Sequence, residues 1–260
     1  MSILEKITTY KKREVEAKKQ AFPIALLERS LLFDRKGPSM AAALKVSTNG
    51  IIAEHKRRSP SKSVINDKVS LPEVVKGYET AGASAISVLT DTPFFGGSLD
   101  DLLLARHSVS LPILRKEFIV DPYQIFEAKA FGADAILLIA ACLSEKKIKE
   151  YSSLAKELNL DVLVEVHNAE ELKRCLHPTI DLLGVNNRNL KTFEVSLETS
   201  KKLASSIPNE FVKVSESGIS SVDAIKELQP YGFQGFLIGE HFMKNEDPGI
   251  SARKFIEQLQ

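Results

Sequence analysis

The feature that most constrains the fold is a regular alternation of short apolar runs with longer amphipathic stretches after residue 50. Such runs are typical of strands buried on both faces of a parallel sheet, and the stretches between them have helical spacing. Eight runs are found, at 51–56, 85–90, 113–118, 135–140, 162–166, 182–186, 211–215 and 235–239. The predicted helices between them include 71–81, 123–131, 145–158, 169–175, 197–205 and 222–228. The pattern therefore predicts an α/β fold built from βα units.

The units could form a closed (β/α)8 barrel or an open doubly wound sheet. A length of about 27 residues per unit suits the barrel. Polar residues end five of the runs, at 54–56, 115–117, 165–167, 186–188 and 215–218. A barrel brings the carboxyl ends of all its strands to one mouth, where its active site lies, whereas an open sheet favours a Gly-rich turn after the first strand. Residues 57–61 contain no glycine, so we predict a TIM barrel.

The first 45 residues precede the alternating pattern and are predicted to be helical. Ile3, Ile7 and Tyr10 have helical spacing, and Pro23 ends this stretch. Two more short helices are predicted to begin at Ile24 and Met40. We expect residues 1–260 to form a single barrel domain, with 1–45 as an N-terminal helical extension packed on the barrel.

Charge and cysteine content exclude several classes of function. The 35 Lys and Arg residues against 34 Asp and Glu residues give a net charge of +1, which provides no basic field for nucleic acid. The cluster 11–13 is balanced by Glu14 and Glu16, so we interpret it as a solvated helix face. No leader-like segment and no membrane-spanning run of roughly 20 apolar residues is found. Two separate cysteines, Cys142 and Cys175, indicate the reducing cytoplasm, and no obligate protein partner is evident.

The strand ends supply candidate acids and bases. Because side chains alternate along a strand, Glu54 and Lys56 share one face, and His55 points to the other. By the same rule Lys116 follows Leu114 and Glu165 follows Leu163 into the barrel mouth. Burial is expected to move the pKa of such lysines down and of such glutamates up, toward the neutral range. The alternative is that these charges are structural ion pairs at the barrel rim.

The last two strand ends predict a phosphate site. Ser217 and Gly218 follow one strand, Gly239 and Glu240 follow the next, and helices begin shortly after each. In barrels these two loops commonly bind phosphate through backbone amides, and Lys56 on the first strand supplies a nearby cation. Glycine at such a turn can also be only a conformational requirement.

Three other features remain open. Residues 94–98 read as a flexible aromatic lid or as a hydrophobic plug, and residues 56–62 as an anion-binding loop or a solvated one. Neither cysteine ends a strand beside a histidine, so both are expected to be inert.

Together these motifs resemble the indole-3-glycerol phosphate synthase family, and the resemblance runs essentially end to end. It rests on ILEKI at 3–7, IAEHKRRSPS at 52–61, VLT at 88–90, FGGS at 95–98, LRKEF at 114–118, DPYQ at 121–124, EVH at 165–167, GVNNR at 184–188, SESGI at 215–219 and GE at 239–240. Two departures are Glu117, where the family usually has aspartate, and Ser63, where it usually has glycine.

The resemblance implies conversion of 1-(2-carboxyphenylamino)-1-deoxyribulose 5-phosphate into indole-3-glycerol phosphate, carbon dioxide and water, in tryptophan biosynthesis, without a metal or organic cofactor. Lys116 would protonate the ribulose carbonyl, and Lys56 would pair with the carboxylate that leaves. The implied catalytic residues are Lys116, Glu165, Glu54, Lys56, Asn186 and Glu216. The implied substrate-binding residues are Ser59, Arg188, Ser217, Phe95 and Phe118, and the phosphate would contact Lys56, Ser217, Gly218, Gly239 and Glu240.

Within that set, dehydration would draw a base and an acid from Glu165, Glu54 and Lys56, and the resemblance does not decide which. Asn186 and Glu216 would hold the sugar hydroxyls, and Arg188 would lie near the carboxylate or order Glu216.

Two alternative functions remain. One is a sugar-phosphate isomerase, which would need a Cys-Asp or Asp-Asp pair at strand ends. The other is a barrel that binds a phosphosugar without turnover. One barrel uses the whole length, so a single activity is expected.

Overall fold

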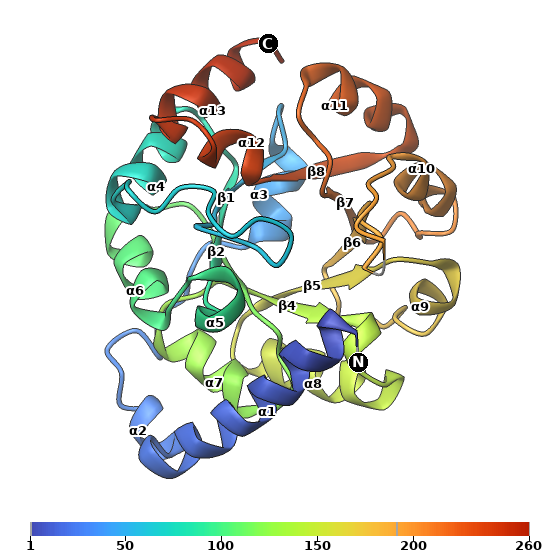
Figure 1. Cartoon of the computed structure of the whole chain (residues 1–260). Helices are drawn as coiled ribbons and strands as arrows, with labels where there is room; N and C mark the ends of the chain where they lie inside the picture. Colours follow the sequence, from blue (N-terminus) through green and yellow to red (C-terminus); the bar gives the residue numbers. More distant parts are fainter. Residues whose placement is uncertain (1, 191, 260) are drawn as a thin grey trace.

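Eight parallel strands close into a barrel in a computed structural model that describes residues 2–190 and 192–259. Each strand pairs with the next along the chain, and β8 pairs with β1, as Figure 1 shows. The strands are β1 (Ile51–His55), β2 (Ala85–Leu89), β3 (Ile113–Lys116), β4 (Ala135–Ile139), β5 (Asp161–Val166), β6 (Leu182–Asn186), β7 (Val212–Glu216) and β8 (Phe233–Ile238). The predicted (β/α)8 TIM barrel is confirmed.

Helices surround the barrel and also precede it. The helices of the βα units are α4 (Leu71–Thr80), α5 (Thr92–Phe95), α6 (Leu99–Ser108), α7 (Tyr123–Ala130), α8 (Glu145–Glu157), α9 (Ala169–Lys173), α10 (Glu198–Ala204), α11 (Val222–Leu228), α12 (Glu240–Met243) and α13 (Pro248–Glu257). All six predicted ranges contain a helix. The pattern did not mark α6, because its apolar residues are not confined to one face: Leu102 is buried, but Leu104 is exposed.

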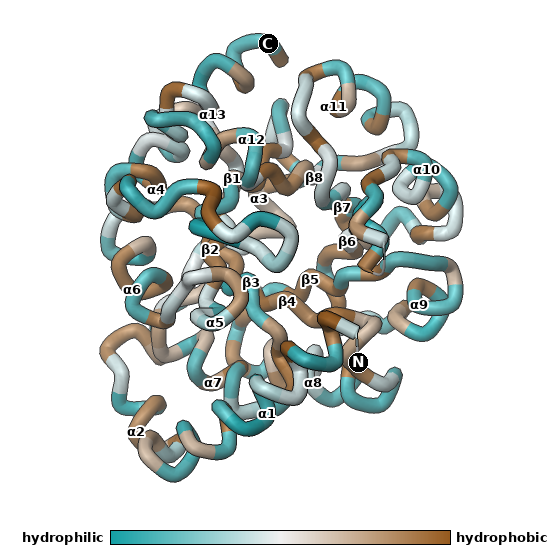
Figure 2. The backbone as a smooth tube through the Cα atoms, viewed as in Figure 1, coloured by the Kyte–Doolittle hydropathy of each residue, from teal (hydrophilic) through white to brown (hydrophobic). Residues whose placement is uncertain are grey.

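The barrel interior is an apolar layer that leads up to the mouth. Ile52, Leu114 and Leu163 belong to this layer, each two residues before a charged residue of the same strand. Period-two alternation therefore directs Glu54, Lys116 and Glu165 inward, as predicted. The tube in Figure 2 is mostly apolar along the strands, whereas the outer helices contain both apolar and polar segments. No helix in the described part of the chain is long and apolar enough to span a membrane.

The N-terminal extension spans the barrel from its mouth to its opposite end. It forms α1 (Ile3–Ala21), α2 (Ile24–Leu27) and α3 (Met40–Val46). Helices α1 and α2 pack against α7, and α3 lies behind the strands in Figure 1, where Met40 and Leu44 join the interior layer. Between them Arg35 forms an ion pair with Asp134, the residue before β4. The extension therefore closes the amino end of the barrel and also reaches its active end.

One interpretation of the extension is wrong. Lys11 was expected on a solvated face, but its side chain is 1% exposed and forms ion pairs with Glu14, Asp91 and Glu117. It lies on the same face of α1 as the buried Ile7 and Val15. Residues spaced four apart lie on one face of a helix, so Lys11 is buried together with Ile7 and Val15. Its burial is possible because Asp91 and Glu117 at the barrel rim compensate its charge.

We expect that an internal void in the apolar layer beneath the site would strongly lower the stability of the protein. Replacing Leu182, which is fully buried in the interior layer, by Ala should lower the free energy of unfolding by about 2–5 kcal/mol, because transfer and cavity terms add. The matched control is Leu31→Ala, since Leu31 is 100% exposed and the same change there should cost less than about 0.5 kcal/mol. Denaturant titration measures both; equal costs would contradict this account of the core.

Candidate active site

A cavity of about 340 Å³ opens at the carboxyl ends of the strands. Fourteen candidate residues were named from the sequence, and every one of them lines it. They are Glu54, Lys56, Ser59, Phe95, Lys116, Phe118, Glu165, Asn186, Arg188, Glu216, Ser217, Gly218, Gly239 and Glu240. They come from seven of the eight βα units, so only closure of the barrel brings them together. Their chemical roles are considered under the proposed function.

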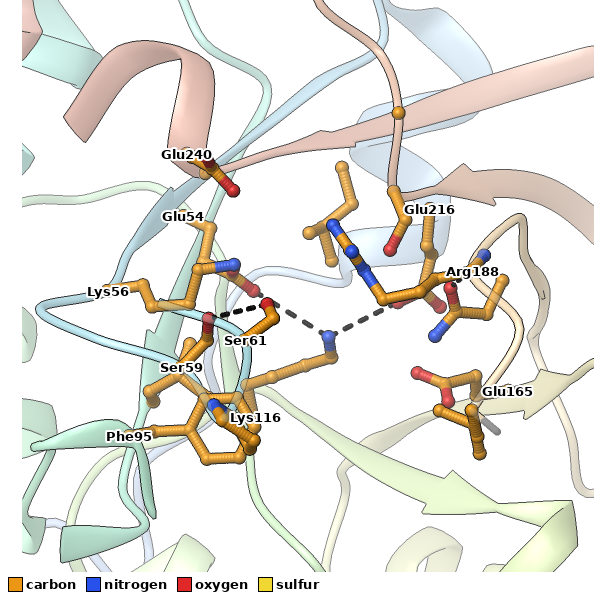
Figure 3. A pocket seen from close by; sticks show the side chains of 18 of the residues that line it. Glu54, Lys56, Ser59, Ser61, Phe95, Lys116, Glu165, Arg188, Glu216 and Glu240 are labelled. Carbon is orange, nitrogen blue, oxygen red and sulfur yellow. Dashed lines mark hydrogen bonds and ion pairs between the residues drawn. The ribbon is translucent and has the colours of Figure 1, made fainter. Parts of the chain in front are cut away.

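Lys116 occupies the centre of the cavity. Its Nζ lies 3.2 Å from Glu216 Oε2 and 3.6 Å from Glu54 Oε2, and Figure 3 shows its side chain reaching between these two carboxylates. Glu54 also accepts from Lys56 Nζ at 2.9 Å and from Ser87 Oγ at 3.3 Å. Lys116 of β3 is thus held by carboxylates from two other strands, β1 and β7, which both neighbour β8.

Charge balance in the cavity determines the direction of the pKa shifts. Three carboxylates, Glu54, Glu165 and Glu216, are 2%, 4% and 1% exposed and face two lysines, Lys56 and Lys116. Burial alone would lower the pKa of Lys116, but the nearby Glu216, Glu54 and Glu165 raise it above its ordinary value. Lys116 therefore carries its proton at neutral pH.

The two carboxylates that contact Lys116 shift in opposite directions. Burial acts to raise the pKa of Glu54, but Lys56 and Lys116 together lower it. Burial raises the pKa of Glu216 to about 7 against the attraction of Lys116, and the charge of Glu165 adds to the rise. The pKa values of Glu54, Lys56, Lys116 and Glu165 were expected to move toward neutrality. This expectation is wrong for Lys116 and Glu54, because burial was weighed without the neighbouring charges.

Glu165 is supported by a histidine on its own strand end. His167 Nε2 lies 3.4 Å from Glu165 Oε1, and His167 Nδ1 lies 3.2 Å from Glu171 Oε2. Burial would lower the pKa of His167, but the hydrogen bond to Glu171 and the charge of Glu165 raise it. The sequence motif included His167, although no role was predicted for it.

Two glycines leave space for the carboxylates. A Cβ on Gly184 of β6 would lie 2.2 Å from Glu216 Oε1, and a Cβ on Gly239 would lie 2.6 Å from Glu54 Oε1. Any larger residue at these positions would displace a carboxylate from Lys116. Gly184 was part of a recognised motif, but its spatial role was not predicted from sequence.

The predicted phosphate loops lie side by side along the cavity wall. Ser217 and Gly218 both have positive φ, 67° and 79°, so the chain turns sharply after β7. Among the described residues, the backbone amides of Gly218, Gly239 and Glu240 have no protein acceptor. Consecutive free amides in such turns form the kind of concave site that binds anions. Lys62 of the loop after β1 lies 3.2 Å from Glu240.

An aromatic wall lies across the cavity from these loops. Phe95 and Phe118 are tilted against each other with centroids 5.7 Å apart. The segment read as a lid or a plug is partly helical: α5 ends at Gly96, and Phe94 packs edge-on against Tyr10 of α1. Phe95 therefore lines the cavity while Phe94 secures the extension.

The basic residues after β1 have protein partners instead of an open anion site. Arg57 pairs with Asp101 through both terminal nitrogens, at 2.6 and 2.8 Å, and Arg58 donates to Thr92 O at 2.8 Å. The interpretation as part of an anion-binding loop is thus wrong for the guanidinium group of Arg57, whose charge is paired with Asp101. Ser59 of the same loop does line the cavity.

Arg188 lines the cavity and is held by its own loop. It donates through its guanidinium to Phe193 O at 3.2 Å and through its backbone amide to Asn186 Oδ1 at 2.9 Å. The structure records no contact between Arg188 and Glu216, so the expectation that Arg188 orders Glu216 finds no support among the described residues.

Some lining residues were not predicted. Ile3, Leu4 and Ile7 of α1 cover one side of the cavity, so the extension is part of the site. Their helical spacing was recognised, but nothing in the sequence showed which barrel face they contact. Neither a cysteine nor an aspartate is among the described lining residues. Burial raises the pKa of Cys142 and of Cys175 to about 12, as expected of inert thiols.

Comparisons with known proteins agree with this site. The sequence model described as indole-3-glycerol phosphate synthase matches residues 4–258. An indole-3-glycerol phosphate synthase of Bacteroides thetaiotaomicron is 49% identical over 258 residues, covering 99% of each chain. One of a Polaromonas species is 43% identical over 254 residues, covering 96% of each chain.

Solved structures with lower identity show the fold alone. A tryptophan synthase complex from Pyrococcus furiosus matches with a TM-score of 0.61 at 18% identity, over 81% of this chain and 97% of that chain. A thiamine phosphate pyrophosphorylase from the same organism matches with a TM-score of 0.58 at 19% identity, over 82% and 97%. The family match over nearly the whole length, together with the site geometry, shows that the chain belongs to the indole-3-glycerol phosphate synthase family.

Proposed function

We propose that this protein converts 1-(2-carboxyphenylamino)-1-deoxyribulose 5-phosphate into indole-3-glycerol phosphate, carbon dioxide and water, as a carboxy-lyase of tryptophan biosynthesis. The observation that carries the proposal is the protonated Lys116 held between Glu54 and Glu216 inside a cavity of substrate size. An aromatic wall on one side and free backbone amides on the other match a substrate with an aromatic ring at one end and a phosphate at the other.

Ring closure comes first. The aromatic carbon that bears the carboxylate attacks the ribulose carbonyl carbon, a new carbon–carbon bond forms, and the carbonyl oxygen takes a proton from Lys116. The three surrounding carboxylates keep Lys116 charged, so it also stabilises the developing alkoxide before proton transfer. The aromatic ring packs against Phe95 and Phe118 during this step.

Decarboxylation follows. The bond from the ring to the carboxylate breaks, and its electron pair returns to the ring system, which restores aromaticity as carbon dioxide leaves. Lys56 pairs with the carboxylate beforehand and orients it, and its own contact to Glu54 fixes its position. This step requires positioning more than acid–base chemistry.

Dehydration completes the reaction. A base removes the proton from the carbon next to nitrogen, and the hydroxyl made in ring closure leaves as water after protonation. Glu165 is the base that the geometry favours. His167 Nε2 lies 3.4 Å from its Oε1, and Glu165 faces the cavity with no direct lysine contact among the described residues. Glu54 and Lys56 complete the set of candidate proton carriers.

The substrate's sugar phosphate lies along the opposite wall. Asn186 and Glu216 hold the sugar hydroxyls, while Arg188 and Ser59 contact the substrate near the loops. The phosphate is bound by the turns at Ser217, Gly218, Gly239 and Glu240, with Lys56 contributing positive charge. The free amides of Gly218, Gly239 and Glu240 support this placement.

Two further expectations are carried as proposals. Residues 1–260 act as one domain, since the extension packs on α7 and lines the cavity. The protein works in the cytoplasm on a small phosphosugar, without a metal, an organic cofactor or an obligate protein partner.

Removing the lysine ammonium tests the proposal directly. Lys116→Met should lower kcat by about 100-fold or more, because the acid and the alkoxide-stabilising charge are lost together. The chain contains no Trp, so indole formation can be followed by fluorescence against a low protein background.

The matched control is Lys213→Met. Lys213 is a buried lysine on β7 that donates to Ala204 O at 2.8 Å, away from the cavity. Its replacement should leave kcat within about twofold of wild type, whatever it costs in stability. Wild type that forms no indole would refute the activity, and an active Lys116→Met variant would refute the role of Lys116.

The pKa of Glu216 predicts a pH dependence. Because burial raises this pKa to about 7, Glu216 is neutral below that pH and a carboxylate above it. Only the carboxylate both pairs with Lys116 and accepts a sugar hydroxyl, so kcat/KM should rise as pH increases through about 7 and then level off.

The comparison with Glu216→Gln assigns that rise. In the variant, kcat/KM should reach a lower plateau and should not rise through pH 7. The substrate phosphate, which titrates near pH 6, about its usual second pKa, and His167 titrate in both proteins. An unchanged step in Glu216→Gln would contradict the assignment.

A further inference from the structure

We propose that Lys11 is a positioning residue for this reaction. Its side chain joins α1 to the strand end that carries Lys116 and to the turn that carries Phe95. The inference rests on the proposed function, because its readout is turnover. Lys11 lies outside the cavity, and its side chain forms no ion pair with any residue to which we assign substrate binding or catalysis.

The first observation is the site that Lys11 occupies. Its ammonium lies 2.9 Å from Glu14, 3.1 Å from Asp91 and 3.2 Å from Glu117, and its side chain is 1% exposed. Asp91 follows β2, and Glu117 follows β3. A buried lysine loses its hydration, so it is stable there only because three carboxylates surround it. Lys11 is thus the shared counter-ion of two adjacent strand ends.

The second observation concerns Glu117, the residue next to Lys116. Its Oε1 accepts from the Phe118 amide at 2.8 Å, and its Oε2 accepts from Thr90 Oγ1 at 2.8 Å. The Thr90 amide in turn donates to Lys116 O at 3.1 Å. Lys11 therefore fixes a carboxylate that holds the backbone directly after Lys116, through the Phe118 amide and, by way of Thr90, the Lys116 carbonyl.

The third observation concerns Asp91, whose two carboxylate oxygens contact different partners. Oδ1 accepts from the amides of Phe94 and Phe95 at 2.8 and 3.2 Å and so caps α5. Oδ2 faces Lys11 at 3.1 Å and has no other hydrogen-bond partner among the described residues. Arg115 lies 3.7 Å from Glu117 Oε2, so Glu117 keeps one cation without Lys11, whereas Asp91 keeps none among the described residues. Loss of Lys11 would therefore leave Asp91 as an unpaired buried carboxylate facing Glu117, and their repulsion would shift the turn that carries Phe95 relative to the Lys116 backbone.

The fourth observation is the position of Lys11 in α1. It is one turn after Ile7, which lines the cavity with Ile3 and Leu4. Anchoring Lys11 thus also holds the apolar start of α1 over the cavity. One ammonium group couples three parts of the site: the acid, the aromatic wall and the helical cover.

The test uses the full chain with Lys11→Met, which keeps side-chain length but removes the charge. We expect kcat to fall about 10- to 100-fold, since displacement of the acid by about 1 Å has effects of that size. The matched control is Lys18→Met on the same helix. The Lys18 side chain is 32% exposed, and its ammonium pairs with Glu14 and Glu127. This control should retain wild-type kcat and KM.

A second variant separates positioning from a merely structural role. The triple variant Lys11→Met, Asp91→Asn, Glu117→Gln removes the cation together with the carboxylates it neutralises. Its melting temperature should recover relative to Lys11→Met, while kcat should stay low because the strand ends are no longer joined. Recovery of kcat together with the melting temperature would overturn the proposal, as would a Lys11→Met variant with wild-type kcat and KM. Inactive wild type would instead refute the proposed function itself.

Discussion

The arrangement at the barrel mouth depends on one interaction, the contact of the Lys116 ammonium with carboxylates from two other strands, β1 and β7. Glu54 and Glu216 approach it at 3.6 and 3.2 Å, and Glu165 contributes charge from β5. Three buried carboxylates could not be held together without buried lysines, and a lone buried lysine would lose its proton. The same contact therefore keeps the acid protonated and keeps the carboxylates within reach of a substrate. Burial raises the pKa of Glu216 to about 7 despite the attraction of Lys116, and the charge of Glu165 adds to the rise.

Much of the surrounding structure serves to keep that contact in place. Gly184 and Gly239 leave room for the carboxylates of Glu216 and Glu54, where a methyl group would collide with them. The apolar layer below fixes the direction in which the strand ends point. The extension contributes from outside the barrel, because its buried Lys11 neutralises the carboxylates that flank Lys116 and Phe95. The site is thus assembled from the barrel and the extension together.

Sequence reasoning located most of the site because strand alternation is a local rule. Leu114 before Lys116 and Leu163 before Glu165 were enough to place both charges inside the barrel, and the structure agrees. The direction of the pKa shift of Lys116 could not be obtained in this way, since it depends on how many carboxylates three other strands bring near it. The chemical roles assigned to these residues remain predictions for the same reason.

The errors have equally specific causes. Lys11 continues the spacing of Ile3, Ile7 and Val15, and that spacing was the available signal for its burial. Its two acidic partners on the barrel, Asp91 and Glu117, are about 80 and 106 residues away in the chain. Arg57 resembled part of an anion site because its partner, Asp101, lies in another βα unit. Helix α6 was missed because Leu104 faces solvent.

The protonation state of Lys116 tests the central claim most directly. Nitrogen-15 NMR of the lysine side chains, with the Lys116 signal assigned by its loss in a Lys116 variant, can follow its Nζ as pH is raised. Our account predicts that Lys116 stays protonated beyond 10.5, the ordinary pKa of lysine, for as long as the protein remains folded. Deprotonation of Lys116 below pH 10.5 in the folded protein would contradict it, since burial would then outweigh the three carboxylates.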